Sequence, residues 1–439
     1  MFILKSKATL PRWLFWAKKG GFAVLDQGLF AGANFLVNLL LARWLEPAQY
    51  GAFAVAYSVF LLLAAFYTAV ITEPMLVFGA GKYVGEFRKY LGILIYSHWG
   101  ITGIISLILG LTALVSWWLG SEDMAWAMAG LALSSPFILF LWLLRLAFYV
   151  RVQPQWAATG GVLYVVLMLA GMCGLYWKRW LSAALALLVM GLASLAVSLW
   201  HATLLRPQWR FAGSTLTPGI VLADHWRYGR WSASATLIML LPSNIYYIIS
   251  PIWLGLEGAA VLRVITTFLM PILNIFQAVS TLLFPVLAQK AKSADTSNFD
   301  LTVRRVLKLL AIASGVYFLL LLICGEWLIN WLYGGRYQNY TDLLLIIGLS
   351  PFSYTITLVL GSALRVRERL HQVLWCYVIS SGVTLVFGPL LMTYWGVYGT
   401  AVGFVISTAT TAVAIALFYI IITHSKTTPS TNNALKIRV

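Results

Sequence analysis

Charged residues are scarce in this chain. Of its 439 residues only 10% are Asp, Glu, Lys or Arg, whereas 61% are hydrophobic. An ordinary soluble domain has about a quarter of its residues charged, and a soluble core of this length could not bury so much apolar surface. The composition therefore excludes a soluble globular protein and predicts an integral membrane protein.

Acidic residues and cysteines are rarer still, with 13 Asp and Glu against 30 Lys and Arg, and three cysteines. Cys173, Cys324 and Cys376 lack the spacing of a metal site or a disulfide framework, so we interpret them as small hydrophobic residues. The five histidines form no cluster either. The net charge of +17 is dispersed along the chain rather than gathered in one polar module, which argues against a nucleic-acid partner. We expect no cofactor and no metal.

Apolar runs long enough to cross a bilayer, about 20 residues in a helix, recur along nearly the whole chain. They predict an all-α fold with about twelve transmembrane helices. The segment "RWLEPAQYG" interrupts the first apolar run and predicts a tight loop between two spans. The predicted spans are 21–43, 51–72, 92–119, 125–149, 159–177, 180–203, 229–250, 258–285, 306–324, 342–364, 372–394 and 397–423.

The basic residues provide an independent test of these spans, because Lys and Arg concentrate in short cytoplasmic loops. If the N-terminus is cytoplasmic, all but five of the 30 basic residues fall on the cytoplasmic side. An even number of spans then predicts that both termini are cytoplasmic. The five exceptions are Arg43, Lys178, Arg179, Arg263 and Arg336.

Short motifs of the first half return in the same order in the second half. Trp44 before "EPAQYGAFAV" corresponds to Trp253 before "GLEGAAVLRV", and Arg145 corresponds to Arg365. Two such repeats predict two six-helix lobes with a central cavity, whose relative movement gives alternating access to a substrate between them. The predicted domains are a cytoplasmic interfacial anchor at 1–20, an N-terminal lobe at 21–203, a cytoplasmic linker at 204–228, a C-terminal lobe at 229–423 and a cytoplasmic tail at 424–439.

Polar side chains inside the predicted spans are the candidate site residues, because they are costly in a bilayer and mark either helix contacts or a wet pathway. In the first span Gln27, Asn34 and Asn38 recur on one helical face. Asp26 beside them is a candidate for coupling to protons or sodium, although an ion pair near the membrane surface explains it equally well. The remaining candidates for substrate binding are Arg43, Arg145, Asn244, Arg263, Asn274, Gln277 and Arg365.

Each candidate also has a plainer interpretation. The amides can fix helix packing, and the arginines near helix ends can extend to the lipid headgroups. The sign of the charges is more informative, because the predicted spans of the second lobe contain no carboxylate well inside the membrane. An exporter of organic cations needs such acids, whereas arginines suit an anionic cargo through paired contacts with phosphate oxygens.

The stretch "LARWLEPAQYGAFAVAYSVFLL" resembles the signature after the first helix of Wzx-type polysaccharide flippases, in the multidrug/oligosaccharidyl-lipid/polysaccharide exporter superfamily. "LDQGLFAGANFLVNLLLAR" and "RYGRW" are similar to that group as well. The resemblance implies a transporter of the bacterial inner membrane that flips an undecaprenyl-diphosphate-linked glycan for surface polysaccharide biosynthesis. It also implies membrane lipids, a polysaccharide polymerase and glycosyltransferases as partners. The first span has no arginine before Arg43, unlike the lipid II flippases of the superfamily, which argues against a peptidoglycan precursor.

Two alternatives remain open at this point. One is an ion-coupled exporter of drugs or metabolites. The other is a membrane-embedded glycosyltransferase or ligase, which would need acidic or histidine groups on a sizeable outer loop. The predicted outer loops are short, and Glu122 and Asp123 form their only acidic pair. We therefore expect that the protein is not an enzyme.

Overall fold

A computed structural model describes residues 12–209, 216–292 and 296–424, and in these residues every regular element is a helix. The predicted anchor at 1–20, linker at 204–228 and tail at 424–439 lie partly outside this described part. Contacts divide the chain into two units, which are described separately. The first extends to Leu237 and includes Gly255–Val264, and the second comprises Ile238–Leu254 and the chain from Ile265 onward.

The first unit contains seven complete α-helices and the start of an eighth among its described residues. A π-helical turn, Thr68–Thr72, joins the second to the third, and a 3₁₀ turn, Val84–Glu86, precedes the fourth. The helices are α1 (Arg12–Trp44), α2 (Pro47–Tyr67), α3 (Glu73–Ala80), α4 (Phe87–Trp118), α5 (Glu122–Val150), α6 (Pro154–Trp177), α7 (Ala183–Leu205) and the beginning of α8 (Pro218–Thr267).

The second unit contains the part of α8 that follows Leu237, apart from the stretch assigned to the first unit, and all later helices. A 3₁₀ turn, Gln338–Tyr340, precedes the short α11. The later helices are α9 (Met270–Lys292), α10 (Thr296–Tyr333), α11 (Asp342–Ile347), α12 (Ser350–Val366) and α13 (Leu370–His424).

A glycine interrupts each of the two longest helices in the described part of the chain. Gly255 in α8 has φ 67° and Gly396 in α13 has φ 58°, a left-handed conformation that interrupts a helix and that glycine adopts without steric cost. The described residues hold 11 apolar helical stretches long enough to cross a membrane, and the last of them has 54 residues. Because Gly396 divides that stretch in two, the predicted number of twelve is confirmed. The span predicted at 258–285 is wrong in its bounds, since α8 ends at Thr267 and α9 begins at Met270.

Several helices extend beyond the predicted spans. The span predicted at 306–324 is part of α10, which covers Thr296–Tyr333. Likewise residues 218–228, which are polar and belong to the predicted linker, form the first turns of α8. Hydropathy marks only the apolar part of a helix, whereas backbone hydrogen bonding continues into the polar ends.

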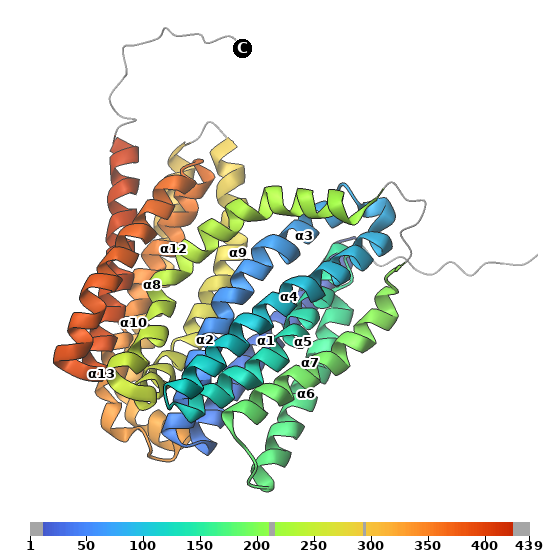
Figure 1. The fold of residues 1–439 in the computed structure, drawn as a ribbon. Helices are drawn as coiled ribbons and strands as arrows, with labels where there is room; N and C mark the ends of the chain where they lie inside the picture. The colour runs from blue at the N-terminus through green and yellow to red at the C-terminus, as the bar shows by residue number, and fades with distance from the viewer. Residues whose placement is uncertain (1–11, 210–215, 293–295, 425–439) are drawn as a thin grey trace, which may run out of the picture. The chain divides into compact units, whose positions relative to one another are not determined.

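Helix α5 is central in the first unit, where it packs against α4 and α7 (Figure 1). Small residues permit the close approach of α5 and α7. A Cβ added at Gly191 of α7 would lie 2.6 Å from the Cβ of Ser134 in α5, and one added at Gly130 of α5 would lie 2.8 Å from the Cα of Ala184. Such small-residue contacts allow membrane helices to pack backbone to backbone.

The segment "RWLEPAQYG" forms the tight loop that its sequence predicts. Helix α1 ends at Trp44 and α2 begins at Pro47, and Glu46 between them is extended. Gly51, four residues into α2, faces the backbone of the helix that follows Gly255. A Cβ at Gly51 would lie 1.8 Å from the carbonyl oxygen of Leu256, so this contact requires glycine.

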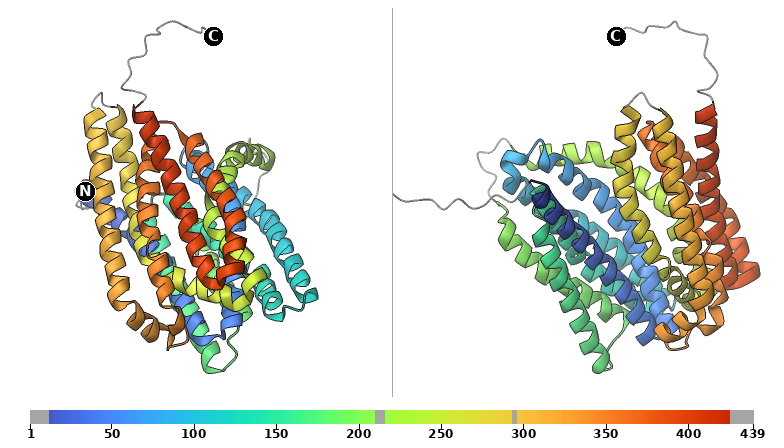
Figure 2. Two further views of the ribbon diagram at one scale, coloured as in Figure 1. Left: turned by 90° about the vertical axis from the view of Figure 1, so that its left-hand side faces the viewer. Right: turned by 180° about the vertical axis from the view of Figure 1, so that it is seen from behind.

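The second unit has its own apolar core around α12. Helix α12 packs against α9, α10 and α13, which Figure 2 shows alongside one another. Val359, Cys376 and Ile415 are fully buried in this core. Cys376 thus behaves as the small hydrophobic residue that the sequence predicts.

Candidate functional site

Four residues of α1, three of them polar, recur at intervals of four and lie on one side of the helix. Asp26 and Asn38 are buried, and Asn34 between them is half-buried. Phe30 is the fourth residue of this set. Gln27, which the sequence groups with the asparagines, is exposed, and it shares a side-chain hydrogen bond with Tyr149 of α5. The buried face of α1 therefore contains Asp26, whereas Gln27, the next residue, lies outside it.

Asp26 forms an ion pair with Arg145 of α5. The Nε–H of Arg145 donates to both carboxylate oxygens at 2.9 Å, and its Nη2 lies 2.8 Å from Oδ2. Tyr149, one turn further along α5, donates its hydroxyl to Oδ2 at 2.5 Å. The guanidinium also lies over the ring of Phe30, 3.8 Å from its centroid. We call Asp26, Arg145, Tyr149 and Phe30 the carboxylate cluster.

A second group of polar contacts is centred on Asn38, three turns from Asp26. Asn38 donates to the carbonyl oxygen of Asn34 at 2.8 Å and to its Oδ1 at 3.1 Å. Its own Oδ1 accepts from the Nε–H of Arg263 at 2.7 Å and from the hydroxyl of Tyr50 at 3.4 Å. Arg263 belongs to the stretch of α8 that is part of the first unit. We call Asn34, Asn38, Tyr50 and Arg263 the amide cluster.

Arg263 is the buried cation of this cluster, with 5% of its surface exposed. Its guanidinium lies 5.6 Å from the ring centroid of Tyr57. Of all Asp, Glu, Lys and Arg residues whose burial the structure describes, only Asp26 and Arg263 are buried. The amide oxygen of Asn38 orients this guanidinium inside the first unit without neutralising its charge.

The structure does not bring the other predicted site residues into these clusters. Asn244 of the second unit is half-buried and donates to the carbonyl oxygen of Leu240 at 3.1 Å, a contact within its own helix. The side chains of the remaining candidates are exposed, one in the first unit and three in the second: Arg43, Asn274, Gln277 and Arg365.

The sequence did not predict the contacts that hold the start of α8 against its neighbours in the first unit. Lys82 and Tyr83 both donate to Asp224. His225 is fully buried; its Nδ1 lies 2.9 Å from the carbonyl oxygen of Val70, and its Nε2 lies 2.6 Å from the hydroxyl of Tyr90. A carbonyl oxygen only accepts, so Nδ1 carries the proton and Nε2 accepts from the tyrosine.

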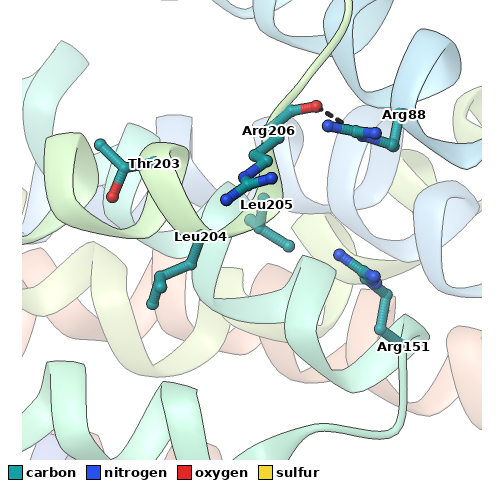
Figure 3. A pocket seen from close by; sticks show the side chains of 6 residues that line it. All are labelled: Arg88, Arg151, Thr203, Leu204, Leu205 and Arg206. Atoms are coloured by element: carbon teal, nitrogen blue, oxygen red, sulfur yellow. Dashed lines mark hydrogen bonds between the residues drawn. The ribbon is translucent and has the colours of Figure 1, made fainter.

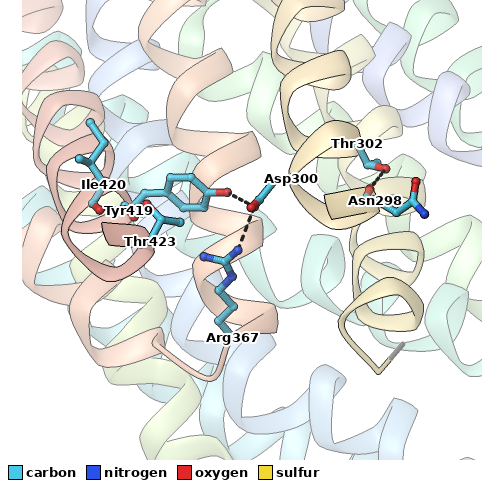
Figure 4. Close-up of polar contacts among 7 residues, drawn as sticks. All are labelled: Asn298, Asp300, Thr302, Arg367, Tyr419, Ile420 and Thr423. Carbon is cyan, nitrogen blue, oxygen red and sulfur yellow. Dashed lines mark hydrogen bonds and ion pairs between the residues drawn. The ribbon is translucent and has the colours of Figure 1, made fainter. Parts of the chain in front are cut away.

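A third polar group, in the second unit, was also not predicted. Arg367, just after α12, and Tyr419 of α13 both donate to Asp300 near the start of α10, at 2.9 and 3.0 Å (Figure 4). The guanidinium of Arg367 packs over the ring of Phe299, 4.7 Å from its centroid. Because the side chain of Asp300 is 40% exposed, the group has the character of a surface ion pair that joins three helix ends.

Comparisons with known proteins identify the architecture. No protein-family model and no curated protein match the chain. Among solved structures, an inward-facing multidrug resistance MATE family transporter of the MOP superfamily is similar over 93% of this chain and all of its own, with a TM-score of 0.76 and 13% identity. An outward-facing MATE transporter (TM-score 0.59, 15% identity) covers 93% of this chain and 96% of its own.

A MOP superfamily transporter from Pyrococcus furiosus is similar over 93% of this chain and 96% of its own, with a TM-score of 0.65 and 13% identity. Its description attributes to it a binding pocket of reverse polarity, which suggests a different function for that protein. At such identities the likeness concerns the fold, which is an all-helical membrane fold of the kind that MATE transporters have.

Proposed function

We propose that this protein is a transporter that moves a lipid-diphosphate-linked oligosaccharide across the bacterial inner membrane by alternating access. The cargo would be an undecaprenyl-diphosphate-linked glycan made for a surface polysaccharide. The multi-span fold, known in inward-facing and outward-facing forms, supports transport. The sequence signature around "LARWLEPAQYG" supports the glycan cargo.

The observation that carries the proposal is the buried guanidinium of Arg263. A charge inside the bilayer is costly, by about 3 to 17 kcal/mol at its centre depending on the method, so an ionisable residue buried among membrane helices is a functional candidate. The neighbours Asn38 and Tyr57 present an amide and an aromatic ring to this cation. A buried guanidinium among polar and aromatic groups favours a diphosphate, because guanidinium groups bind phosphate oxygens through paired hydrogen bonds.

The alternative is an ion-coupled exporter of drugs or metabolites, and the burial of Asp26 is the observation that favours it. A buried carboxylate in the first span suits a proton or sodium site. Here, however, both oxygens of Asp26 accept hydrogen bonds from Arg145. An ion-coupled step through Asp26 would have to open this pair, whereas glycan flipping leaves it closed as a structural link.

Reconstituted vesicles test the proposal. A lipid-diphosphate-linked oligosaccharide with a labelled sugar is placed in the bilayer, and an external glycosidase removes the label from the outer leaflet only. With the protein present, label from the inner leaflet should become accessible. We expect Arg263→Gln to slow this exposure roughly tenfold or more, since a charge-assisted hydrogen bond contributes about 1.5 to 3 kcal/mol. Arg263→Lys should retain more activity because it keeps the charge.

The matched control is Arg305→Gln, which removes the same charge from an exposed position of α10. Its rate should equal that of the unmodified protein. If Arg263→Gln folds and flips the oligosaccharide as fast as Arg305→Gln, the role assigned to Arg263 is wrong.

A further inference from the structure

Three arginines line one pocket at the ends of α4, α5 and α7. The pocket has a volume of about 310 Å³ and lies within the first unit (Figure 3). Its lining consists of Arg88, Arg151, Thr203, Leu204, Leu205 and Arg206. No residue of this lining is acidic, and all three arginines are exposed to solvent.

The backbone around the pocket is fixed by contacts between α4 and the segment that follows α7. Arg206 ends α7 in the left-handed conformation, with φ 49° and ψ 61°, and turns the chain toward α4. The Nε–H of Arg88 then donates to the carbonyl oxygen of Arg206 at 2.8 Å, and the N–H of Gln208 donates to the carbonyl oxygen of Arg88 at 2.9 Å. A Cβ at Gly92 would lie 2.0 Å from the carbonyl oxygen of Gln208, so the segment rests directly on α4.

This arrangement concentrates positive charge. Lys19 of α1 donates to the carbonyl oxygen of Val152, next to Arg151, which adds a fourth cation to this end of the unit. Like charges gathered in one pocket repel one another, and a bound anion removes that repulsion. Guanidinium groups fit the oxygens of a phosphate particularly well, because several N–H donors can point at them together.

The surroundings of the pocket are typical of the headgroup layer of a membrane. Trp200 precedes Thr203 of the lining by about one turn of α7, and its ring lies 6.1 Å from that of Trp156. Trp209, just after Gln208, is 60% exposed. Tryptophan is enriched where a membrane protein crosses from acyl chains to headgroups. Leu204 of the lining is half-buried and presents apolar surface, which suits a ligand that carries a phosphate on an apolar body.

We propose that this pocket binds the phosphate group of an anionic membrane phospholipid and so joins the ends of α4, α5 and α7 through the lipid headgroup. The site is separate from the amide cluster, and its occupant is a resident lipid rather than the transported cargo. Basic pockets between membrane helices on the cytoplasmic side bind anionic headgroups in this way, and the charge rule predicts that this end of the unit is cytoplasmic.

The test measures binding of a phosphatidylglycerol with short acyl chains to the purified full chain in neutral detergent, by native mass spectrometry and by the shift in melting temperature. Phosphatidylcholine and inorganic phosphate are titrated in parallel. The variant is Arg151→Gln with Arg206→Gln, which leaves the bond from Arg88 to the carbonyl oxygen of residue 206 in place. The control is Arg304→Gln with Arg305→Gln, which removes the same two charges from exposed positions of α10.

We expect phosphatidylglycerol to bind the unmodified protein and the control equally, and the pocket variant roughly tenfold or more weakly, by loss of charge-assisted hydrogen bonds. Phosphatidylcholine should bind weakly to all three. If inorganic phosphate shows the same dependence on the pocket arginines, the phosphate group itself is the recognised element and the proposal stands. Equal binding of phosphatidylglycerol to the pocket variant and to the control would overturn it, whatever the glycan-flipping activity of each protein.

Discussion

The ion pair between Asp26 and Arg145 gives the sharpest prediction about stability. Asp26 is completely buried, and only 11% of the Arg145 side chain is exposed. Removing one partner leaves the other as an uncompensated charge in an apolar environment, which costs about 3 to 5 kcal/mol for buried pairs. We therefore expect Asp26→Asn to lower the free energy of unfolding by about that amount.

The size of the effect follows from the geometry. The amide introduced by Asp26→Asn would keep one oxygen to accept from Arg145 and Tyr149, but it would lack the charge that the guanidinium faces at 2.9 Å. The cation–π contact with Phe30 would remain and would offset a part of the loss, of the order of 1 to 2 kcal/mol. The residual cost should still exceed that of breaking an exposed ion pair, which is about 0 to 1 kcal/mol.

A double-mutant cycle provides the assay. Unfolding of the protein in lipid nanodiscs is measured for Asp26→Asn, for Arg145→Met and for the two combined. The combined variant removes both charges, so it should be more stable than either single variant, as found when buried pairs are replaced by neutral groups. If Asp26→Asn is as stable as the unmodified protein, or if the two effects simply add, the pair does not stabilise the first unit.

The other predictions concern packing, pH and the second unit. Gly191→Leu should destabilise the protein by about 1 to 3 kcal/mol through a clash with Ser134; unchanged thermal unfolding would contradict the close approach of α5 and α7. Burial lowers the pKa of His225 from 6.5 to about 4, so the unfolded chain takes up the proton first. The free energy of unfolding should fall by up to about 3 kcal/mol as the pH drops through this range, and His225→Gln should abolish that loss. Asp300→Asn should cost only about 1 kcal/mol, because its pair with Arg367 is partly exposed; an effect as large as that of Asp26→Asn would refute this ranking.

The helical fold and the number of spans were predictable because both depend on local features of the sequence. Runs of apolar residues identify spans, and the break in "RWLEPAQYG" gives the loop between Trp44 and Pro47. The helix ends were less accurate. Residues 218–228 are polar and helical at once, and hydropathy alone cannot distinguish such a segment from a linker.

The contacts of the site required information that no local pattern holds. The sequence predicts four of the polar residues in the two clusters but not which of them pair. They are Asp26, Arg145, Asn38 and Arg263. Asp26 and Arg145 are 119 positions apart, and Asn38 and Arg263 are 225 apart. Which residues meet depends on how each helix is rotated about its axis, and this is set by packing against several neighbours at once.

His225 and Tyr149 match no catalytic or metal-binding pattern, so the sequence analysis did not predict them as site residues. His225 belongs to no metal-binding pattern in the sequence, but it is a buried residue whose hydrogen bond with Tyr90 links α8 to α4. Tyr149 could have been found, since it lies one turn from Arg145 on the same face of α5 and supplies a further hydrogen-bond donor to Asp26.

A comparison of two cargoes in the same vesicles tests most directly which cargo the protein moves. Vesicles containing the purified protein receive either a labelled lipid-diphosphate-linked oligosaccharide or a fluorescent organic cation, with and without a proton or sodium gradient. We predict that the protein exposes the oligosaccharide on the opposite leaflet and leaves the cation where it was loaded. Gradient-driven movement of the cation, with no movement of the oligosaccharide, would contradict the account and would identify the protein as an exporter of small molecules.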